Sequence, residues 1–253
     1  MDEGKKHEGG NSWITVWGNR TIVAGLLLIL GFLALLQSPG NTAEHPGLVF
    51  SQSDLPQLQD RIKIDEHAEL WAEILQEAEG YCTPGTDRYA NPSDVDGGPT
   101  RFGKTIGHSF GRRLSRWMET LGFAYWMTGE ERFGDHGVQL LVASARALPA
   151  TDERMARSYA GGRGDFMRGL ALGYDWLGGR LSPVEKKIVE ETSAGYIQNI
   201  LDDAHQENMW WVPYHNYSGV AFGAAGLLSL NLQETYPEKS KVWLEDCIGL
   251  INR

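Results

Sequence analysis

The sequence has 253 residues, of which 42% are hydrophobic, enough for one sizeable buried core or two small ones. Its 33 acidic and 23 basic side chains give a net charge of -10, the opposite of the balance expected for a protein that binds nucleic acid. The 9 Trp residues are many for this length. Exposed Trp rings often stack on sugars, although buried Trp is the more common case.

An uncharged stretch runs from residue 21 to 43, and its centre, residues 22–36, is apolar. A membrane span takes about 20 apolar residues and a signal-peptide core about 7–15, so the stretch is either a signal anchor or a signal peptide. Arg20 precedes it and Glu44 follows it, which places the polar leader, residues 1–20, in the cytoplasm. We therefore expect an exported chain, membrane-anchored with its bulk outside, or periplasmic or secreted if the segment is cleaved.

Residues 44–253 show helical patterns that are separated by turn signals. Ser53 is the expected cap of a first helix, and Pro56 stands in its first turn. A second helix is expected over residues 66–79. Residues 81–110 are rich in Gly and Pro and predict a long loop.

Further helices are expected over residues 114–127, 131–147, 165–177, 183–203, 216–232 and 241–251. Ser182 followed by Pro183 and Glu185 is a strong start signal for one of them. No alternating strand pattern occurs outside the loops, so we predict an all-α fold of antiparallel helix pairs, either an (α/α) toroid or a plain bundle. The last helix stops without a glycine cap or polar tail, which indicates a truncated chain.

Cys82 and Cys247 lie far apart without a CxxC partner, which argues against a zinc or redox site. In an exported chain they form one disulfide or stay as two buried thiols. The sequence contains no P-loop, HExxH or GxSxG motif and no paired-carboxylate spacing. It therefore predicts no metal and no cofactor.

The densest polar and aromatic group lies at the expected start of the helix over residues 216–232. Free N–H groups and the helix dipole favour negative charge at such a start, so the group suits an anionic ligand. The alternative is that Asn216 only caps the helix while the rings pack in the core. The candidate residues are Trp210, Trp211, Tyr214, His215, Asn216 and Tyr217.

A second group is basic, with no acidic residue between Arg101 and Arg116. Arginine binds carboxylates and sulfates through two parallel hydrogen bonds, so this group is expected to contact an acidic ligand. The alternative is a solvated or salt-bridged surface. The candidate substrate-binding residues are His108, Arg112, Arg113 and Arg116.

Four stretches occur in a characteristic order: HPGLVF with DLPQL (45–50 and 54–58), LGFAYWMTGE (121–130), LGYDWL with LSP (172–177 and 181–183), and Trp211 through His215-Asn216 into the small-residue helix. Together they resemble the N-terminal helical domain of the heparinase II/III-like polysaccharide lyases, which include alginate and heparan sulfate lyases. The resemblance covers about residues 44–253. It implies an incomplete (α/α) toroid, which β-sandwich domains follow in the family.

Lyases of this family cleave uronate-containing polysaccharides by β-elimination. The resemblance implies that Asn216, with His215 beside it, neutralises the uronate carboxylate and so acidifies the adjacent C5 proton. The family's catalytic Tyr and second His lie farther along than Arg253, so weak or no activity is expected from these residues alone. Tyr217 and Tyr214 are the candidate substitutes for the Tyr that transfers protons.

The leading interpretation is a fragment of a carbon-oxygen lyase that acts on polysaccharides. A noncatalytic glycan-binding or cell-surface toroid is one alternative. A glycoside hydrolase of the (α/α)-toroid kind is another, with Asp165 and Asp175 as its candidate carboxylates. The expected partners are an acidic polysaccharide or oligosaccharide and, if residues 21–43 are uncleaved, the membrane; no nucleic acid is expected.

Overall fold

The computed structural model describes residues 45–95, 108–153, 160–206 and 216–252, which belong to one unit, Thr42–Arg253. The regular structure of these residues is helical, with no strand among them, so the all-α prediction is confirmed there. No helix in these ranges combines the length and the apolarity that crossing a membrane requires. The predicted anchor or signal segment lies outside the described residues.

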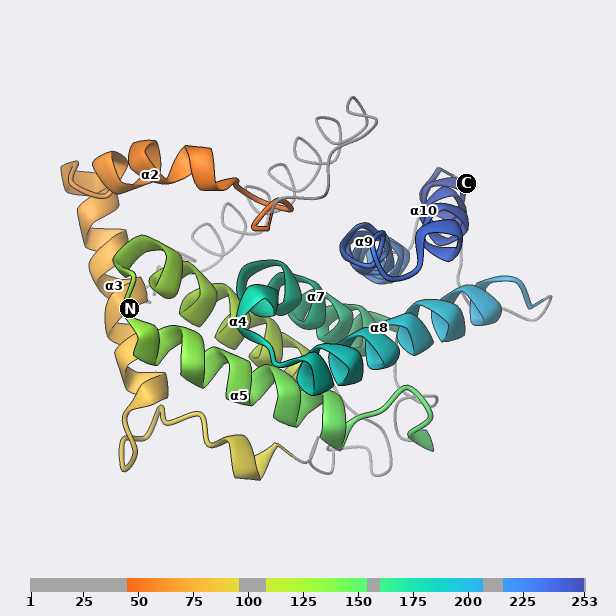
Figure 1. The fold of residues 1–253 in the computed structure, drawn as a ribbon, viewed down its shortest axis with the longest axis horizontal. Helices are drawn as coiled ribbons and strands as arrows, with labels where there is room; N and C mark the ends of the chain where they lie inside the picture. The colour runs from red at the N-terminus through yellow and green to blue at the C-terminus, as the bar shows by residue number, and fades with distance from the viewer. Residues whose placement is uncertain (1–44, 96–107, 154–159, 207–215, 253) are drawn as a thin grey trace, which may run out of the picture. The chain divides into compact units, whose positions relative to one another are not determined.

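The helices follow the predicted order (Figure 1), although some ends differ. They are η1 (Gln52–Asp54), α2 (Leu55–Arg61), α3 (Asp65–Cys82), η2 (Pro92–Asp94), α4 (His108–Thr128), α5 (Glu131–Ala147), α7 (Ala160–Leu177), η3 (Gly178–Arg180), α8 (Pro183–Ala204), α9 (Asn216–Asn231) and α10 (Pro237–Ile251). Both α4 and α7 begin earlier than predicted. Arg112 and Arg113 therefore lie on the first turns of a helix rather than at its entry.

Two predicted helix starts have different outcomes. At α8 the Ser182 hydroxyl accepts a hydrogen bond from the Glu185 N–H at 3.4 Å, and the Glu185 carboxylate accepts one from the Ser182 N–H at 2.9 Å, which confirms the predicted cap. The expected Ser53 cap is wrong. The 3-10 turn η1 precedes α2, so Ser51 caps that turn and Asp54 takes the N-cap position of α2.

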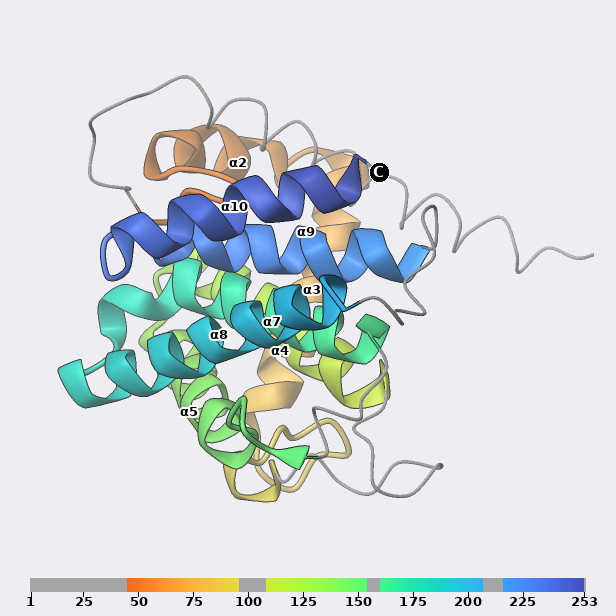
Figure 2. The same cartoon turned by 90° about the vertical axis from the view of Figure 1, so that its right-hand side faces the viewer.

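Three helical hairpins follow one another: α4–α5, α7–α8 and α9–α10 (Figures 1 and 2). Their first helices form one layer, in which α4 packs on α7 and α7 packs on α9. Gly111, near the start of α4, lies against Asp165 of α7, and Gly122, near the end of α4, lies against Trp176. Residue numbers thus rise together, and α4 and α7 run parallel.

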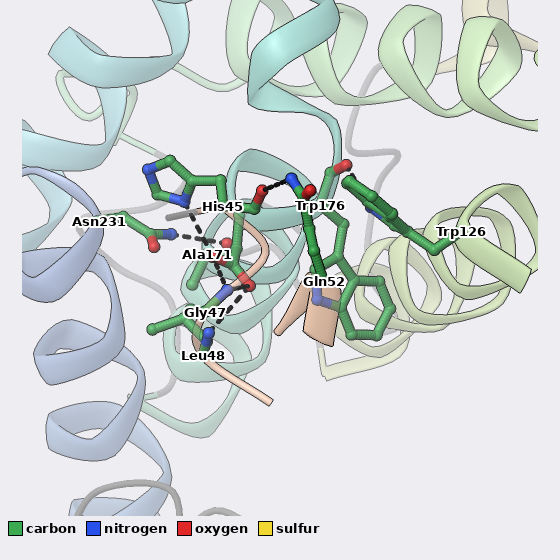
Figure 3. Close-up of polar contacts among 9 residues, drawn as sticks. His45, Gly47, Leu48, Gln52, Trp126, Ala171, Trp176 and Asn231 are labelled. Atoms are coloured by element: carbon green, nitrogen blue, oxygen red, sulfur yellow. Dashed lines mark hydrogen bonds and ion pairs between the residues drawn. The ribbon is translucent and has the colours of Figure 1, made fainter. Parts of the chain in front are cut away.

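The third helix of this layer, α9, also runs parallel to α7. Gly164 lies against Val220, and farther along the Asn231 amide donates a hydrogen bond to the Ala171 carbonyl oxygen at 2.7 Å (Figure 3). The starts of α4, α7 and α9 therefore lie at the same end of the layer.

The second helices of the hairpins, α5, α8 and α10, form the other layer. The Tyr196 hydroxyl of α8 donates a hydrogen bond to the Leu148 carbonyl oxygen, which follows α5, at 2.9 Å. Trp243 of α10 donates one to the Gln198 side chain of α8 at 3.1 Å. Large side chains between the layers are fully buried, among them Leu114, Met118, Leu121, Phe133, Phe166 and Tyr196. Burial of these apolar side chains supplies most of the stability.

An extended segment, residues 45–50, lies against the end of α7 and is held by Asp175. One carboxylate oxygen accepts from the Gly47 N–H at 3.0 Å, and the other accepts from the Leu48 N–H at 3.1 Å. His45 Nδ1 lies 3.0 Å from the same carboxylate (Figure 3). Asp175 is only 2% exposed, so a buried charge is satisfied by three groups of one segment.

Candidate functional site

The starts of α4, α7 and α9 lie close enough to share one region. A Cβ added at Gly111 would be 2.6 Å from the Gly162 carbonyl oxygen, and one added at Gly164 would be 2.9 Å from the Ala221 Cα atom. Glycine is therefore required for these backbone contacts. They bring the first described turns of three helices together, and the positive end of a helix dipole favours an anion.

Asn216 is the first residue of α9, and its side chain is exposed. Tyr217 follows it and is half-buried. Because α9 and α4 each pack on α7, Asn216 and the first turns of α4 flank the first turns of α7. Four members of the predicted group, Trp210, Trp211, Tyr214 and His215, lie outside the described residues, so their roles stay predictions.

Two arginines of the basic group remain accessible at the start of α4, where His108 is the first residue. Arg112 is exposed, and its Nε lies 3.3 Å from the Asp165 carboxylate. The Arg113 guanidinium lies 5.3 Å from the ring centroids of both Phe110 and Trp117. No carboxylate among the described residues pairs with Arg113. Its guanidinium is oriented by aromatic contact while its N–H groups can still donate to a ligand.

The third arginine, Arg116, has a complete partner. Its Nε lies 2.7 Å and its Nη2 lies 3.0 Å from the two Glu77 carboxylate oxygens, and the Tyr81 hydroxyl donates to Glu77 at 2.7 Å. Burial acts to raise the pKa of Glu77, but the hydrogen bonds from Arg116 and Tyr81 lower it on balance. Arg116 thus ties α4 to α3, which matches the salt-bridged alternative for this residue.

Sequence reasoning did not select Glu119 and Arg168, which extend the site along α4 and α7. Arg168 Nη2 lies 3.3 Å from Glu119, and Arg168 Nε donates to the Ser115 hydroxyl at 3.3 Å. Burial raises the pKa of Glu119, Arg168 and Arg116 oppose the shift, and Asp165 adds to it. The sequence spacing could have pointed to Glu119. It lies three residues after Arg116, which lies four residues after Arg112, and residues at these spacings share one face of a helix.

The two carboxylates considered for a glycoside hydrolase do not face each other. Asp165 and Asp175 are ten residues apart on α7, which is about 15 Å along a helix axis and more than a hydrolase pair needs. Asp175 is also buried and occupied by residues 45–50. The carboxylate pair named for this alternative is therefore wrong.

Both cysteines are free thiols in the structure, Cys82 half-buried and Cys247 buried. Burial raises the pKa of Cys82 to about 11 and that of Cys247 to about 12, so both are protonated near neutral pH. In the part of the chain that the structure describes, no three His, Cys, Asp or Glu side chains gather as they would around a metal ion.

No protein-family model matches the chain, and no curated protein matches its sequence. The resemblance to polysaccharide lyases therefore rests on the four stretches of sequence alone.

Proposed function

We propose that this chain binds an acidic polysaccharide at the starts of α4, α7 and α9, as the N-terminal part of a lyase that cleaves uronate-containing chains. The observation that carries the proposal is the parallel order of these helices. It puts Asn216 on one flank of the first turns of α7, and Arg112 and Arg113 on the other. Helix dipoles and guanidinium groups there act on an anion together.

The two layers support an (α/α) toroid as the finer description of the fold. In a toroid, successive hairpins place their first helices in an inner ring and their second helices in an outer ring. The parallel helices α4, α7 and α9 correspond to an inner ring, and α5, α8 and α10 correspond to an outer ring. Three hairpins would form an arc of such a ring, with the proposed site at one end of it.

The chemistry of β-elimination suits this arrangement. An amide donor at a helix start, such as Asn216, neutralises a uronate carboxylate, and this stabilises the charge that develops when the adjacent proton is removed. Arg113 would bind a neighbouring acidic group and fix the position of the sugar chain. Tyr217 follows Asn216 in the sequence and is the candidate for proton transfer among the described residues.

The experiment is an assay of the purified full chain against a panel of uronans, with near-ultraviolet absorbance for unsaturated product, a reducing-sugar assay and titration calorimetry for binding. Binding with unsaturated product supports the lyase. Binding without product of either kind favours the noncatalytic glycan-binding protein. New reducing ends without absorbance indicate a hydrolase, and no binding to any uronan rejects the proposed site.

A further inference from the structure

The extended segment 45–50 follows the predicted anchor or signal segment, residues 21–43, almost directly. His45 comes nine positions after Leu36, the last residue of the apolar centre. His45 is fixed to the domain, because its Nδ1 atom lies 3.0 Å from the buried Asp175 carboxylate at the end of α7. Nine residues span at most about 30 Å even when fully extended, so a bilayer that holds the apolar centre lies within that reach of His45.

Two helices lie beside this segment. Phe50 of the segment and Trp71 of α3 both contact the ring of Phe123, with ring centroids 6.0 and 5.8 Å away. The Gln59 amide of α2 donates a hydrogen bond to the Met127 carbonyl oxygen, one turn farther along α4, at 3.2 Å. The segment, α2 and the first turns of α3 therefore gather around the last turns of α4. We call this region, residues 45–71, the entry surface.

The entry surface exposes large apolar side chains. Val49 is 45% exposed, Ile64 is 58% exposed and Leu70 is 48% exposed. In addition, α2 contains no buried residue, although apolar residues recur at i, i+3 and i+7 along it and at its C-cap, which places them on one face. These half-buried residues are Leu55, Leu58 and Ile62. A surface helix normally packs such a face against the core, so the entry surface keeps apolar area that the described part of the domain does not cover.

The rest of the domain lies away from this surface. At one edge of the layer α3 packs on α4, and at the other edge α9 packs on α7 with α10 beside it (Figure 1). The starts of α4, α7 and α9 lie at the end of α7 that is away from Asp175. A bilayer against the entry surface would therefore leave both α10 and the proposed glycan site uncovered.

The charges of the entry surface indicate which lipid chemistry fits it. Both signs occur between residues 60 and 69, where the charged residues are Asp60, Arg61, Lys63, Asp65, Glu66 and Glu69. They form no basic cluster, so attraction to anionic headgroups is not expected. Apolar contact with the interface of a neutral phospholipid bilayer fits better. Because an anchor keeps the domain at the membrane, a weak contact of this kind is sufficient.

We propose that the entry surface rests on the interface of the membrane that holds residues 21–43, with Val49, Ile64 and Leu70 in contact with lipid. The short connection to His45 and the uncovered apolar face of α2 carry this inference. It rests on the predicted anchor and goes beyond the glycan site. The orientation leaves that site open to a polysaccharide outside the membrane.

The test uses the full chain in phosphatidylcholine vesicles, with an environment-sensitive dye on one introduced cysteine. The probe variants are Val49→Cys and Ile64→Cys. Ile251→Cys is the matched control, because Ile251 is 48% exposed and lies at the end of α10. All variants also carry Cys82→Ser, and this background alone measures any dye that reaches the buried Cys247. The readouts are the blue shift of the emission and its loss when the vesicles contain a lipid-borne quencher.

The dyes at Val49→Cys and Ile64→Cys are expected to show a blue shift and quenching, and the dye at Ile251→Cys neither. Equal signals at all three positions would overturn the inference, as would release of the chain from the vesicles by alkaline carbonate, because the anchor would then be absent. Titration of the same vesicles with an oligouronate separates the two proposals. Quenching without glycan binding supports the orientation and rejects the proposed function, whereas glycan binding without quenching rejects the orientation alone.

Discussion

A carboxylate oxygen of Asp175 lies 3.0 Å from the backbone nitrogen of Gly47, a residue 128 positions earlier in the chain. This contact fixes the segment that precedes the first helix to the end of α7. It explains why the Asp175 carboxylate can be buried: it accepts hydrogen bonds from the backbone N–H groups of Gly47 and Leu48.

Replacing Asp175 with Asn should destabilise the fold by about 2–3 kcal/mol, since hydrogen bonds to a charged acceptor are lost and an amide N–H₂ group faces backbone donors. Urea unfolding followed by circular dichroism measures this loss. Asp60→Asn is the matched control: its carboxylate is 78% exposed and pairs with Lys63 on the surface, so a change below about 1 kcal/mol is expected. Equal losses for the two variants would contradict the role given to Asp175.

The close approach of α4 and α7 can be tested at Gly111. An added Cβ would meet backbone atoms of α7 at 2.6 and 2.8 Å, so Gly111→Ala should cost roughly 1–3 kcal/mol. Gly223 of α9 has open space around an added Cβ, and Gly223→Ala should stabilise the helix by about 0.5–1 kcal/mol. Thermal unfolding of both variants checks the contrast. A neutral Gly111→Ala would show that the two backbones are not in contact there.

His136 should make stability depend on pH. It is buried, and its Nε2 donates to the Ala90 carbonyl oxygen at 2.9 Å. Burial lowers its pKa, while hydrogen bonds to the Ala90 and Tyr81 carbonyl oxygens oppose the shift. The folded state therefore prefers the neutral ring, so its contribution is complete above the unfolded value of about 6.5 and is lost as the pH falls from there toward the folded pKa.

Urea unfolding between pH 7 and pH 5 measures this dependence. His136→Gln keeps a donor without a titrating ring and should flatten the decline. A decline that His136→Gln leaves as steep as before would assign the pH dependence to other groups.

The arginines at the start of α4 should separate into binding and structural residues. Arg113→Ala is expected to weaken binding of an oligouronate by about fivefold at low salt with little loss of stability. Arg116→Ala leaves Glu77 without its bidentate partner and should cost about 1 kcal/mol of stability with a smaller effect on binding. Calorimetry and urea unfolding on the same samples separate the two effects. The reverse pattern would mean that Arg116 is the ligand contact.

Binding should also weaken as salt rises, because the chain has a net charge of -10 and attraction comes from a local group of cations and helix starts. Titrations of the native chain at low and high sodium chloride measure the dependence. Affinity that does not change with salt would count against an electrostatic site.

Local patterns predicted most of the helices, because caps and apolar spacing act within one turn, as at Ser182. The early starts of α4 and α7 were missed for a physical reason: glycines near them, such as Gly111 and Gly162, resemble loop signals but serve close helix packing. Local sequence patterns do not predict contacts between residues that are far apart in the chain. Neither the pairing of Arg116 with Glu77 nor that of Asp175 with residues 45–50 has a signature in the sequence alone.

The central claim, an acidic glycan site at the starts of α4, α7 and α9, is tested most directly by titrating an oligouronate into the full chain and into Asn216→Ala. Asn252→Ala, which removes an exposed amide after α10, is the control. The account predicts roughly tenfold weaker binding for Asn216→Ala, the size of one hydrogen bond to a charged group, and unchanged binding for the control. Equal affinity of Asn216→Ala and the native chain would contradict it.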